Sequence, residues 1–457
     1  MRPKNSQFDN TFPPGEGGES ALCGVLRAYA AGGPARFHMP GHKGLGSPCF
    51  APQYDVTELP GTDNLLAPEG VLAAAQEEAA KAYGAARTFF CTGGATAGVA
   101  AMLLALPPNS TVVVQRGCHR SVYGGLALGG HRPVYVQEGP DGLLAPAAVE
   151  EALCAHPGAA AVMVTRPDYF GRCGGLPALA AACRAHGAAL LVDEAHGAHF
   201  ALSGALPQAA AGYADAWVNS AHKTLRCPNQ GAYLHCGSGK VSPDALRRAL
   251  FLLHTTSPAY PLLAALDCAW REAKGWDYPA HIARVGRLAL PEGVERVFCQ
   301  EGSDPTRLVL DVSGRKITGF AAEAALRRAG VWVEMADWRH VVAITVPIDP
   351  DAWYNRLETA LKTLPWGKGR PQLPPAPPLP QAAMLPREAM LAPMERKPLC
   401  EAIGRVAAEA VGVYPPGSAI VAPGEVFTAE AAAYLKTMQQ LGGSLFGCAG
   451  GAPVVRE

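Results

Sequence analysis

Lys223 stands in a setting that a surface lysine does not need. In the stretch "VNSAHKTL" it follows His222 at the end of an apolar run and precedes a threonine. A lysine that must form an imine with an aldehyde needs such a site, because its amine has to be held beside the reacting group. Ser220 and His222 are close enough in the chain to contact a phosphate of the same ligand.

An aspartate ends another apolar run. Asp193 follows "ALLV" in "ALLVDEAHGAHF", and ligands of open α/β sheets bind at the carboxyl ends of buried parallel strands. A helix-capping aspartate would give the same pattern, so that alternative stays open. His196 and His199 could be metal ligands, but their spacing suggests no third ligand nearby and predicts no metal site.

A glycine-rich turn joins a strand to a helix in "FFCTGGATAGVAAMLLAL". Gly94, Ala95 and Thr96 would place backbone N–H groups and one hydroxyl at a helix N-terminus, which is a natural phosphate site. The turn matches neither the dinucleotide nor the P-loop pattern. His119 follows a further strand-like run, "VVVQRGC", and offers a flat ring, although a structural histidine is the alternative.

These four parts occur in the order phosphate turn, flat side chain, strand-end acid and lysine. Pyridoxal phosphate needs all of them. Its phosphate needs the turn, its ring needs a planar group, and its aldehyde needs a lysine. A carboxylate keeps the pyridine nitrogen protonated, because a negative charge raises the pKa of a cation. The order therefore predicts a pyridoxal-phosphate site.

The elements that must position these residues alternate along the chain. Apolar runs such as "STVVVQ", "AAAVMVT" and "AALLVDEA" predict buried parallel strands, and alanine-rich stretches between them predict helices. This alternation is typical of a doubly wound α/β fold. We divide the chain into an N-terminal arm (1–60), a cofactor-binding large domain (61–255), a small α+β domain (256–365), a proline-rich linker (366–381) and a C-terminal domain (382–457).

Composition narrows the class of protein. The 457 residues carry zero net charge, 49% are hydrophobic and 17% are charged. Nucleic-acid and membrane-surface proteins usually have a basic excess, so we expect neither partner. The 13 cysteines are irregularly spaced and form no CxxC pair, which argues against a disulfide framework. No signal peptide or spanning segment is evident, and we expect a cytoplasmic protein.

The chain resembles the Orn/Lys/Arg decarboxylase family of fold type I pyridoxal-phosphate enzymes, in the shorter form without a receiver-like N-terminal domain. The resemblance implies a mostly parallel large-domain sheet of the seven-stranded type. It rests on six motifs in the family's order, namely "FHMPGHKG" (37–44), "DVTELPGTDNL" (55–65), "DEAHGAH" (193–199), "SAHKTL" (220–225), "TTSPAY" (255–260) and "YPPGSAIVAPGE" (414–425).

The resemblance implies a role for each matching residue around the cofactor ring. Lys223 would form the imine with the cofactor aldehyde, and Asp193 would pair with the pyridinium nitrogen. His119 would stack on the ring, and His196 would lie near it.

The resemblance also implies contacts to the cofactor phosphate. Ser220 and His222 would reach it from the same chain, whereas Thr256 and Ser257 would reach it from a neighbouring subunit of a homodimer or higher homo-oligomer. The family's turn has a hydroxyl residue where this chain has Ala95. At about 1 kcal/mol for an ordinary hydrogen bond, the loss would weaken cofactor binding several-fold.

The implied activity is decarboxylation of arginine, lysine or ornithine to the corresponding amine and CO2. The distal cationic group of such a substrate needs an acid, for which Glu334, Asp337 and Glu425 are candidates. Two of them lie beside Trp332 and Trp338, and acid with aromatic faces suits a planar guanidinium. This puts arginine ahead of lysine and ornithine, although solvated acids and packed tryptophans are the alternative.

Two other functions remain open. The same four parts would serve another fold type I reaction, such as transamination or retro-aldol cleavage. The chain could instead be an inactive paralogue that acts as an assembly subunit. The presence of both Lys223 and Asp193 argues against the inactive paralogue.

Overall fold

The structure is a computed structural model that describes residues 32–33, 35–37, 43, 63–237, 239–298, 302–369, 374–414 and 417–456. Most of the predicted N-terminal arm lies outside these residues. So does most of the motifs at 37–44 and 55–65, as well as the two prolines of "YPPG".

The large sheet has seven strands in the order β2-β8-β7-β6-β5-β3-β4. Only β8 runs antiparallel to its neighbours, and the other adjacent pairs are parallel. The predicted α/β fold with a mostly parallel sheet is therefore confirmed. The strands are β2 (Arg87–Cys91), β3 (Thr111–Gln115), β4 (Arg132–Val136), β5 (Ala161–Thr165), β6 (Ala189–Asp193), β7 (Ala216–Ser220) and β8 (Ala232–Cys236).

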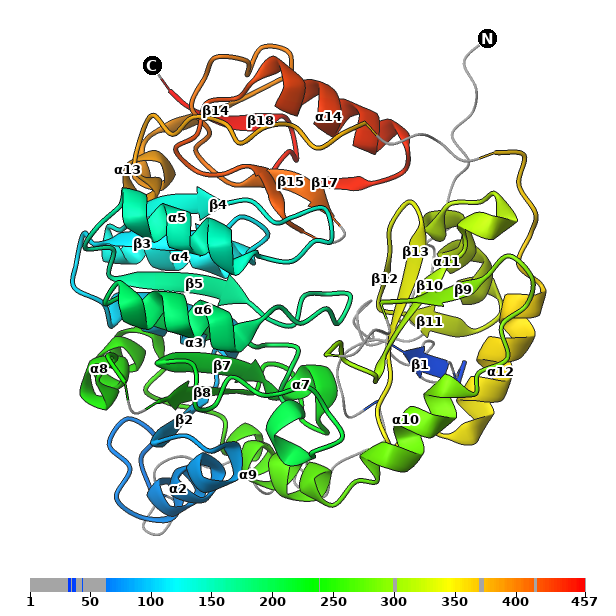
Figure 1. The fold of residues 1–457 in the computed structure, drawn as a ribbon, viewed down its shortest axis with the longest axis horizontal. Coiled ribbons are helices and arrows are strands. Elements are labelled where there is room, and N and C mark those ends of the chain that lie inside the picture. The colour runs from blue at the N-terminus through cyan, green and yellow to red at the C-terminus, as the bar shows by residue number, and fades with distance from the viewer. Residues whose placement is uncertain are drawn as a thin grey trace, which may run out of the picture.

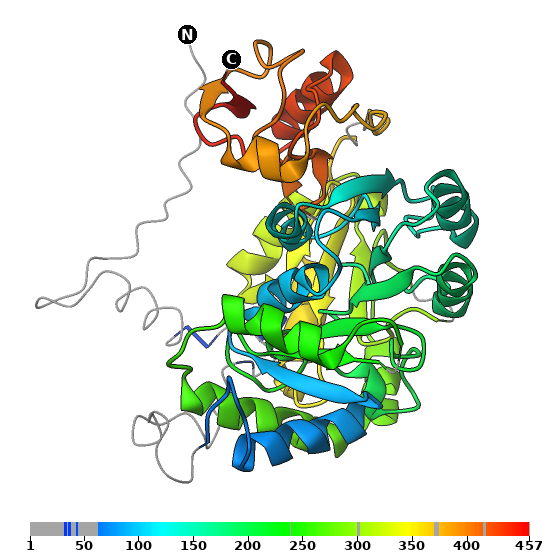
Figure 2. The same cartoon turned by 90° about the vertical axis from the view of Figure 1, so that its left-hand side faces the viewer.

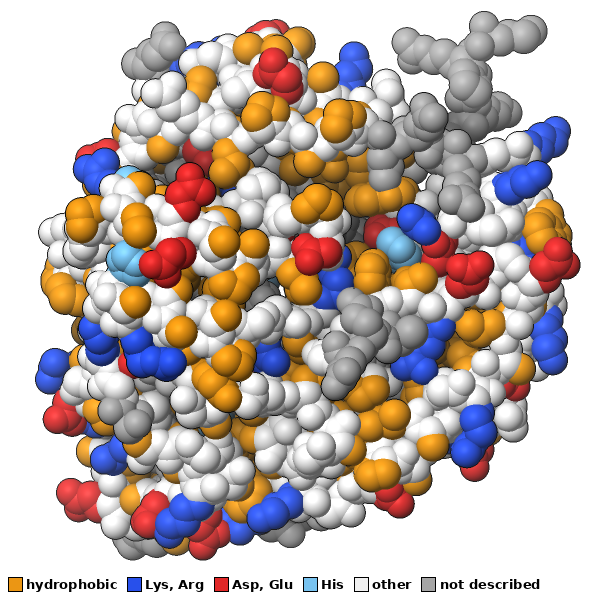
Figure 3. Space-filling model, in the orientation of Figure 1, with side chains coloured by type: hydrophobic (Ala, Val, Ile, Leu, Met, Phe, Trp, Pro, Cys, Tyr) orange, Lys and Arg blue, Asp and Glu red, His pale blue; other side chains and the backbone are white. Residues whose placement is uncertain are grey.

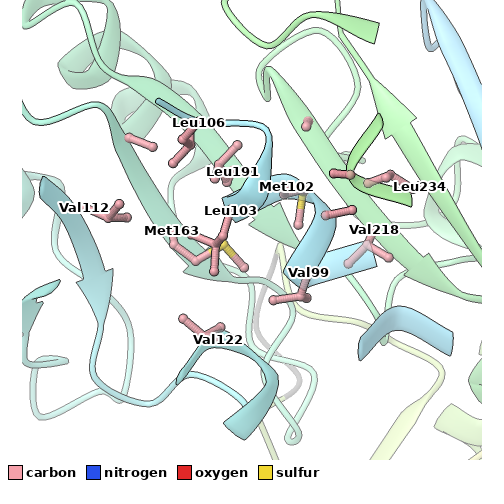
Figure 4. Close-up of a cluster of buried hydrophobic side chains, with 14 of the residues drawn as sticks. Val99, Met102, Leu103, Leu106, Val112, Val122, Met163, Leu191, Val218 and Leu234 are labelled. Atoms are coloured by element: carbon pink, nitrogen blue, oxygen red, sulfur yellow. The ribbon is translucent and has the colours of Figure 1, made fainter. Parts of the chain in front are cut away.

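Helices cover both faces of this sheet (Figure 1). Because side chains alternate along a strand, β3, β5, β6 and β7 each supply residues to two hydrophobic clusters, one per face. Figure 4 shows part of one cluster, in which Met102 and Leu103 lie beside Met163 and Leu191. The first face carries α3 (Gly94–Leu104), α4 (Arg120–Gly129) and α8 (Pro243–Leu253), and the second carries α5 (Pro146–Ala155) and α6 (Leu176–Ala185).

A third cluster lies at the β2 and β8 end of the sheet. It joins α2 (Val71–Tyr83) and α9 (Tyr260–Lys274) to buried tyrosines of the large unit. Two of the alanine-rich stretches predicted as helices form α2 and α6. Gly187 follows α6 with a φ of +71°, which suits a helix C-terminus.

A smaller α+β unit lies beside the large one (Figure 1). Its antiparallel sheet has the order β12-β13-β10-β9. A separate pair joins β1 (Ala35–Phe37) in parallel to β11 (Val331–Val333). The other elements of the unit are α10 (Tyr278–Gly286), β9 (Glu295–Val297), β10 (Arg307–Asp311), α11 (Gly319–Arg328), β12 (Met335–Ala336), β13 (His340–Ile344) and α12 (Asp351–Lys362).

The C-terminal segment forms a third unit, which lies next to β4 in both views (Figures 1 and 2). Ala419 and Ala422 belong to the core of the large sheet, so this unit packs directly on it. Its elements are α13 (Pro386–Leu391), β14 (Met394–Lys397), β15 (Val411–Tyr414), β16 (Ala419–Val421), α14 (Ala429–Gln440), β17 (Ser444–Phe446) and β18 (Ala452–Val455).

Two general features agree with the composition. Basic and acidic side chains are interspersed on the face shown in Figure 3, as expected for zero net charge. Within the described part of the chain, every helix is too short or too polar to cross a bilayer.

Candidate active site

A cavity of about 500 Å³ lies at the carboxyl ends of the parallel strands of the large sheet. Its floor is formed by the residues that follow β2, β3, β6 and β7. Residues 376–379 of the proline-rich segment and residues 417–420 of the C-terminal unit line it too. The segment predicted as a linker therefore also forms part of the wall of the cavity.

Lys223 enters this cavity from α7 (Ala221–Thr224), a single turn that directly follows β7. Its Nζ lies 2.9 Å from Nε2 of His196 and 5.8 Å from the ring centre of Tyr169. Burial lowers the pKa of the Lys223 amine, and the negative charges of Asp193 and Glu334 oppose that shift. A lowered pKa makes the unprotonated, nucleophilic amine more accessible.

Asp193 and His119 face the same cavity. Asp193 is the last residue of β6, it is 4% exposed, and its Oδ1 accepts the N–H of Ala195 at 3.1 Å. His119 caps α4, and its Nδ1 accepts the N–H of Ser121 at 3.2 Å. Burial lowers the pKa of His119, which favours a neutral, flat ring beside the carboxylate.

The glycine-rich turn begins α3 at the edge of the cavity. Gly93 precedes the helix and Gly94 opens it with a φ of +71°, a backbone conformation that favours glycine. At Gly98, a Cβ would lie 2.5 Å from Cγ2 of Val218, so α3 packs directly on β7. This close contact keeps the N–H groups of Ala95 and Thr96 near the residues that follow β7.

Ser220 and His222 line the same cavity as this turn. The Ser220 Oγ lies 3.1 Å from Nδ1 of His222, which in turn lies 3.2 Å from the carbonyl oxygen of Gly231. A hydroxyl, an imidazole and a helix N-terminus together form a site for an anion such as a phosphate.

The donor set fits pyridoxal phosphate. The cavity holds a lysine, a strand-end carboxylate, a flat histidine and an anion site. Thr165 is paired with Asp193 across β5 and β6, and it also lines the cavity. Its buried Oγ1 makes no hydrogen bond within the described part of the chain, which leaves a donor for a polar atom of a ligand.

Thr256 and Ser257, assigned to a neighbour's site from the motif, lie apart from the cavity of their own chain. Both are exposed on the segment between α8 and α9. The Ser257 N–H donates to Oγ1 of Thr255 at 3.2 Å.

The three candidate substrate acids are placed differently. The charge of Glu334 acts on Lys223 and on Tyr169, so this acid lies near the site. Asp337 is 3% exposed, and its carboxylate binds the N–H and the ring of His340, the latter at 2.9 Å. Asp337 therefore holds a turn of the small unit, and we do not retain it as a substrate contact.

Glu425 joins the C-terminal unit to the large unit. Its Oε1 and Oε2 lie 2.6 and 2.8 Å from the two terminal nitrogens of Arg116, and both side chains are buried. Oε2 also accepts the N–H of Ala422 at 2.7 Å. Because the carboxylate is fully engaged in this structural pair, we no longer assign Glu425 to the substrate.

We expect Glu425→Gln to lower the free energy of unfolding by about 3–5 kcal/mol, because the buried charge of Arg116 loses its partner. The matched control is Glu409→Gln, which removes an exposed pair with Arg396 and should cost about 0–1 kcal/mol. Thermal unfolding of both variants measures the difference. Equal shifts in the two variants would contradict this role of Glu425.

Sequence reasoning missed two side chains around Lys223. Tyr169 lies on the loop after β5, and its ring centre is 4.7 Å from that of His196. Arg307 begins β10 in the small unit, and its Nη2 lies 3.3 Å from Nδ1 of His196. Neither residue belongs to a motif with a local chemical pattern, so no signal in the sequence singled them out.

Comparison with known proteins identifies the family of the chain. Residues 21–279 match the model of the Orn/Lys/Arg decarboxylase major domain, and residues 375–449 match that of its C-terminal domain. An arginine decarboxylase of Halalkalibacterium halodurans is 33% identical, over 93% of this chain and 94% of that protein. One of Bacillus subtilis is 31% identical, over 91% and 93% respectively.

A solved structure agrees in fold. The constitutive lysine decarboxylase of E. coli superposes with a TM-score of 0.71 at 19% identity, over 90% of this chain and 76% of that one. The large-domain and C-terminal matches and the full-length relatives lead to one conclusion. The chain belongs to the Orn/Lys/Arg decarboxylase family.

Proposed function

We propose that this protein is a pyridoxal-phosphate-dependent decarboxylase that converts a basic amino acid into the corresponding amine and CO2. One observation carries the proposal. The amine of Lys223 and the carboxylate of Asp193 face one cavity, with His119 and an anion-binding turn beside them. The relatives named arginine decarboxylase support the reaction class.

When bound, the cofactor supplies a conjugated ring that accepts the electrons left behind as CO2 departs. The first turn of α3, with Ser220 and His222, would hold the phosphate. Asp193 would keep a proton on the ring nitrogen, and His119 would pack against the ring. Lys223 would hold the cofactor covalently, and its amine or a nearby histidine would return a proton to the substrate carbon.

For the substrate we put arginine ahead of lysine and ornithine. The names of the two relatives support this order. We also propose that Glu334 binds the distal cation of the substrate. The charge of Glu334 acts on Lys223 and on Tyr414, and this supports the proposal.

A decarboxylation screen tests the proposed function. CO2 release from arginine, lysine and ornithine is measured with the wild type and with Glu334→Gln. We expect arginine to be used fastest and Glu334→Gln to raise KM more than it lowers kcat, because the distal contact mainly binds the substrate. Faster turnover of lysine or ornithine would reverse the preference. Decarboxylation of a neutral amino acid alone, or transamination without CO2 release, would contradict the class.

We further propose at least a homodimer with shared sites. The exposed Thr256 and Ser257 follow α8, whose Phe251 and Leu252 are 59% and 74% exposed. Large apolar side chains on a surface suit burial in an isologous contact. Light scattering under assay conditions should therefore detect no active monomer, and Leu252→Glu should weaken association. A fully active monomer would exclude shared sites.

The location of the protein in the cytoplasm stays a prediction.

A further inference from the structure

We propose that Arg307 is a positioning residue that fixes the tautomer of His196 and thereby keeps the amine of Lys223 uncharged. The three side chains form a continuous line across the junction of the large and small units. Nη2 of Arg307 lies 3.3 Å from Nδ1 of His196, and Nε2 of the same ring lies 2.9 Å from Nζ of Lys223. Figure 1 shows the sheet that contains β10 beside the large unit.

The chemistry of the three groups permits one arrangement of protons. A guanidinium has only donors and stays charged, so Nδ1 of His196 must accept from Arg307. A neutral imidazole then carries its proton on Nε2. That proton points at Nζ of Lys223, and only an amine with a free lone pair can accept it. An ammonium on Lys223 has no lone pair, so its N–H groups would meet the N–H of His196 Nε2 with no acceptor between them.

The protonation of the neighbours agrees with this arrangement. Burial lowers the pKa of His196 well below its usual value, and the charge of Arg307 acts in the same direction. His119 and His222 would act in that direction too when protonated. The ring of Tyr169, 4.7 Å away, completes the surroundings without adding a charge. His196 is thus held neutral from every side.

Arg307 is itself held in place. Nη2 lies 3.9 Å from Oδ2 of Asp304, whose Oδ1 accepts the N–H and the hydroxyl of Thr306 at 2.9 and 2.7 Å. Burial alone would raise the pKa of Asp304, but the charges of His199 and Arg307 bring it down to about 2. This carboxylate therefore stays ionised and fixes the guanidinium opposite His196.

The two other nitrogens of the Arg307 guanidinium indicate why an arginine is buried at this position. Nε and Nη1 of Arg307 make no hydrogen bond within the described part of the chain, although the side chain is 1% exposed. Buried unpaired donors cost stability, so packing alone gives no account of an arginine here. At Gly171 a Cβ would lie 2.8 Å from Cβ of Arg307, so the loop that carries Tyr169 also depends on this side chain.

The test determines the tautomer of His196 directly in the protein without cofactor. Long-range ¹H–¹⁵N NMR distinguishes the two neutral forms of histidine, and His196→Gln assigns the signals. We expect the Nε2–H form in the wild type and a substantial Nδ1–H population in Arg307→Met. The matched control is Arg315→Lys, which alters another buried arginine of the small unit that binds the carbonyl oxygens of Glu292 and Leu364. It should leave the signals of His196 unchanged.

A second measurement reports the protonation state of the Lys223 amine. The rate at which added pyridoxal phosphate becomes covalently bound is measured against pH. We expect Arg307→Met to move this profile to higher pH, so that the rate near neutral pH falls about tenfold for each unit of pKa gained by Lys223. Arg307→Lys, which keeps the charge but changes the donor, should lie between Arg307→Met and the wild type.

The outcomes separate this proposal from the proposed function on which its catalytic meaning rests. An Nδ1–H tautomer in the wild type overturns the proposal, and that measurement needs no variant to fold. An unchanged tautomer in a folded Arg307→Met overturns it as well. Absence of decarboxylation with all three basic amino acids would instead refute the proposed function and leave the tautomer result intact.

Discussion

Lys223→Ala should abolish decarboxylation, with a loss of at least about 10³-fold, and should remove the visible absorbance of covalently bound cofactor. Lys223 is the sole lysine among the described residues that line the cavity, so no neighbour can supply the missing amine. The variant loses both the covalent attachment and a proton-carrying group. General acid–base catalysis alone contributes about 10²–10⁴-fold. Turnover and absorbance are measured on the same sample.

The matched control is Lys240→Ala, which removes an exposed lysine that donates to the carbonyl oxygen of Gly187. It should keep both signals. Lys223→Ala should still bind the cofactor noncovalently, because Ser220, His222 and the first turn of α3 remain. Cofactor binding alone therefore does not test the role of Lys223 in decarboxylation. Normal decarboxylation by the variant would remove Lys223 from the proposed role.

The motifs predicted side chains that the structure brings to one cavity, because parallel strands order their ends. The carboxyl ends of the parallel strands lie at one edge of such a sheet, so residues that follow separate apolar runs meet there. Asp193 ends β6, and Lys223 lies just beyond β7, its neighbour in the sheet. The apolar runs alone therefore sufficed to bring these two side chains together, without any knowledge of the loops between them.

Contacts between units could not be foreseen in the same way. Glu425 looked available for a substrate, but it pairs with Arg116, which lies 309 residues away in the sequence. Arg307 reaches His196 over a separation of 111 residues. Such pairs depend on how the small and C-terminal units dock on the large sheet. No local periodicity encodes this docking, because hydrophobic periodicity indicates which face of an element is buried but not what it is buried against.

The same limit applied to the proline-rich segment. Its composition predicts an extended, semi-rigid chain, and residues 374–380 do form neither helix nor strand. Composition does not say what such a segment lies against. In the structure residues 376–379 line the cavity together with residues 417–420, so the segment contributes to the site as well as connecting two units.

Asp193→Asn should retain the covalent link between Lys223 and the cofactor but lose about 10²-fold or more in kcat. A neutral amide does not hold a proton on the ring nitrogen, and each unit of pKa lost there corresponds to about 1.4 kcal/mol. The fold should survive, because the amide oxygen can still accept the N–H of Ala195 that Oδ1 now accepts at 3.1 Å. Single-turnover CO2 release and the visible spectrum measure the two effects separately. No helix begins at Asp193, so a wild-type rate would mean that Asp193 only holds the turn after β6 through the N–H of Ala195.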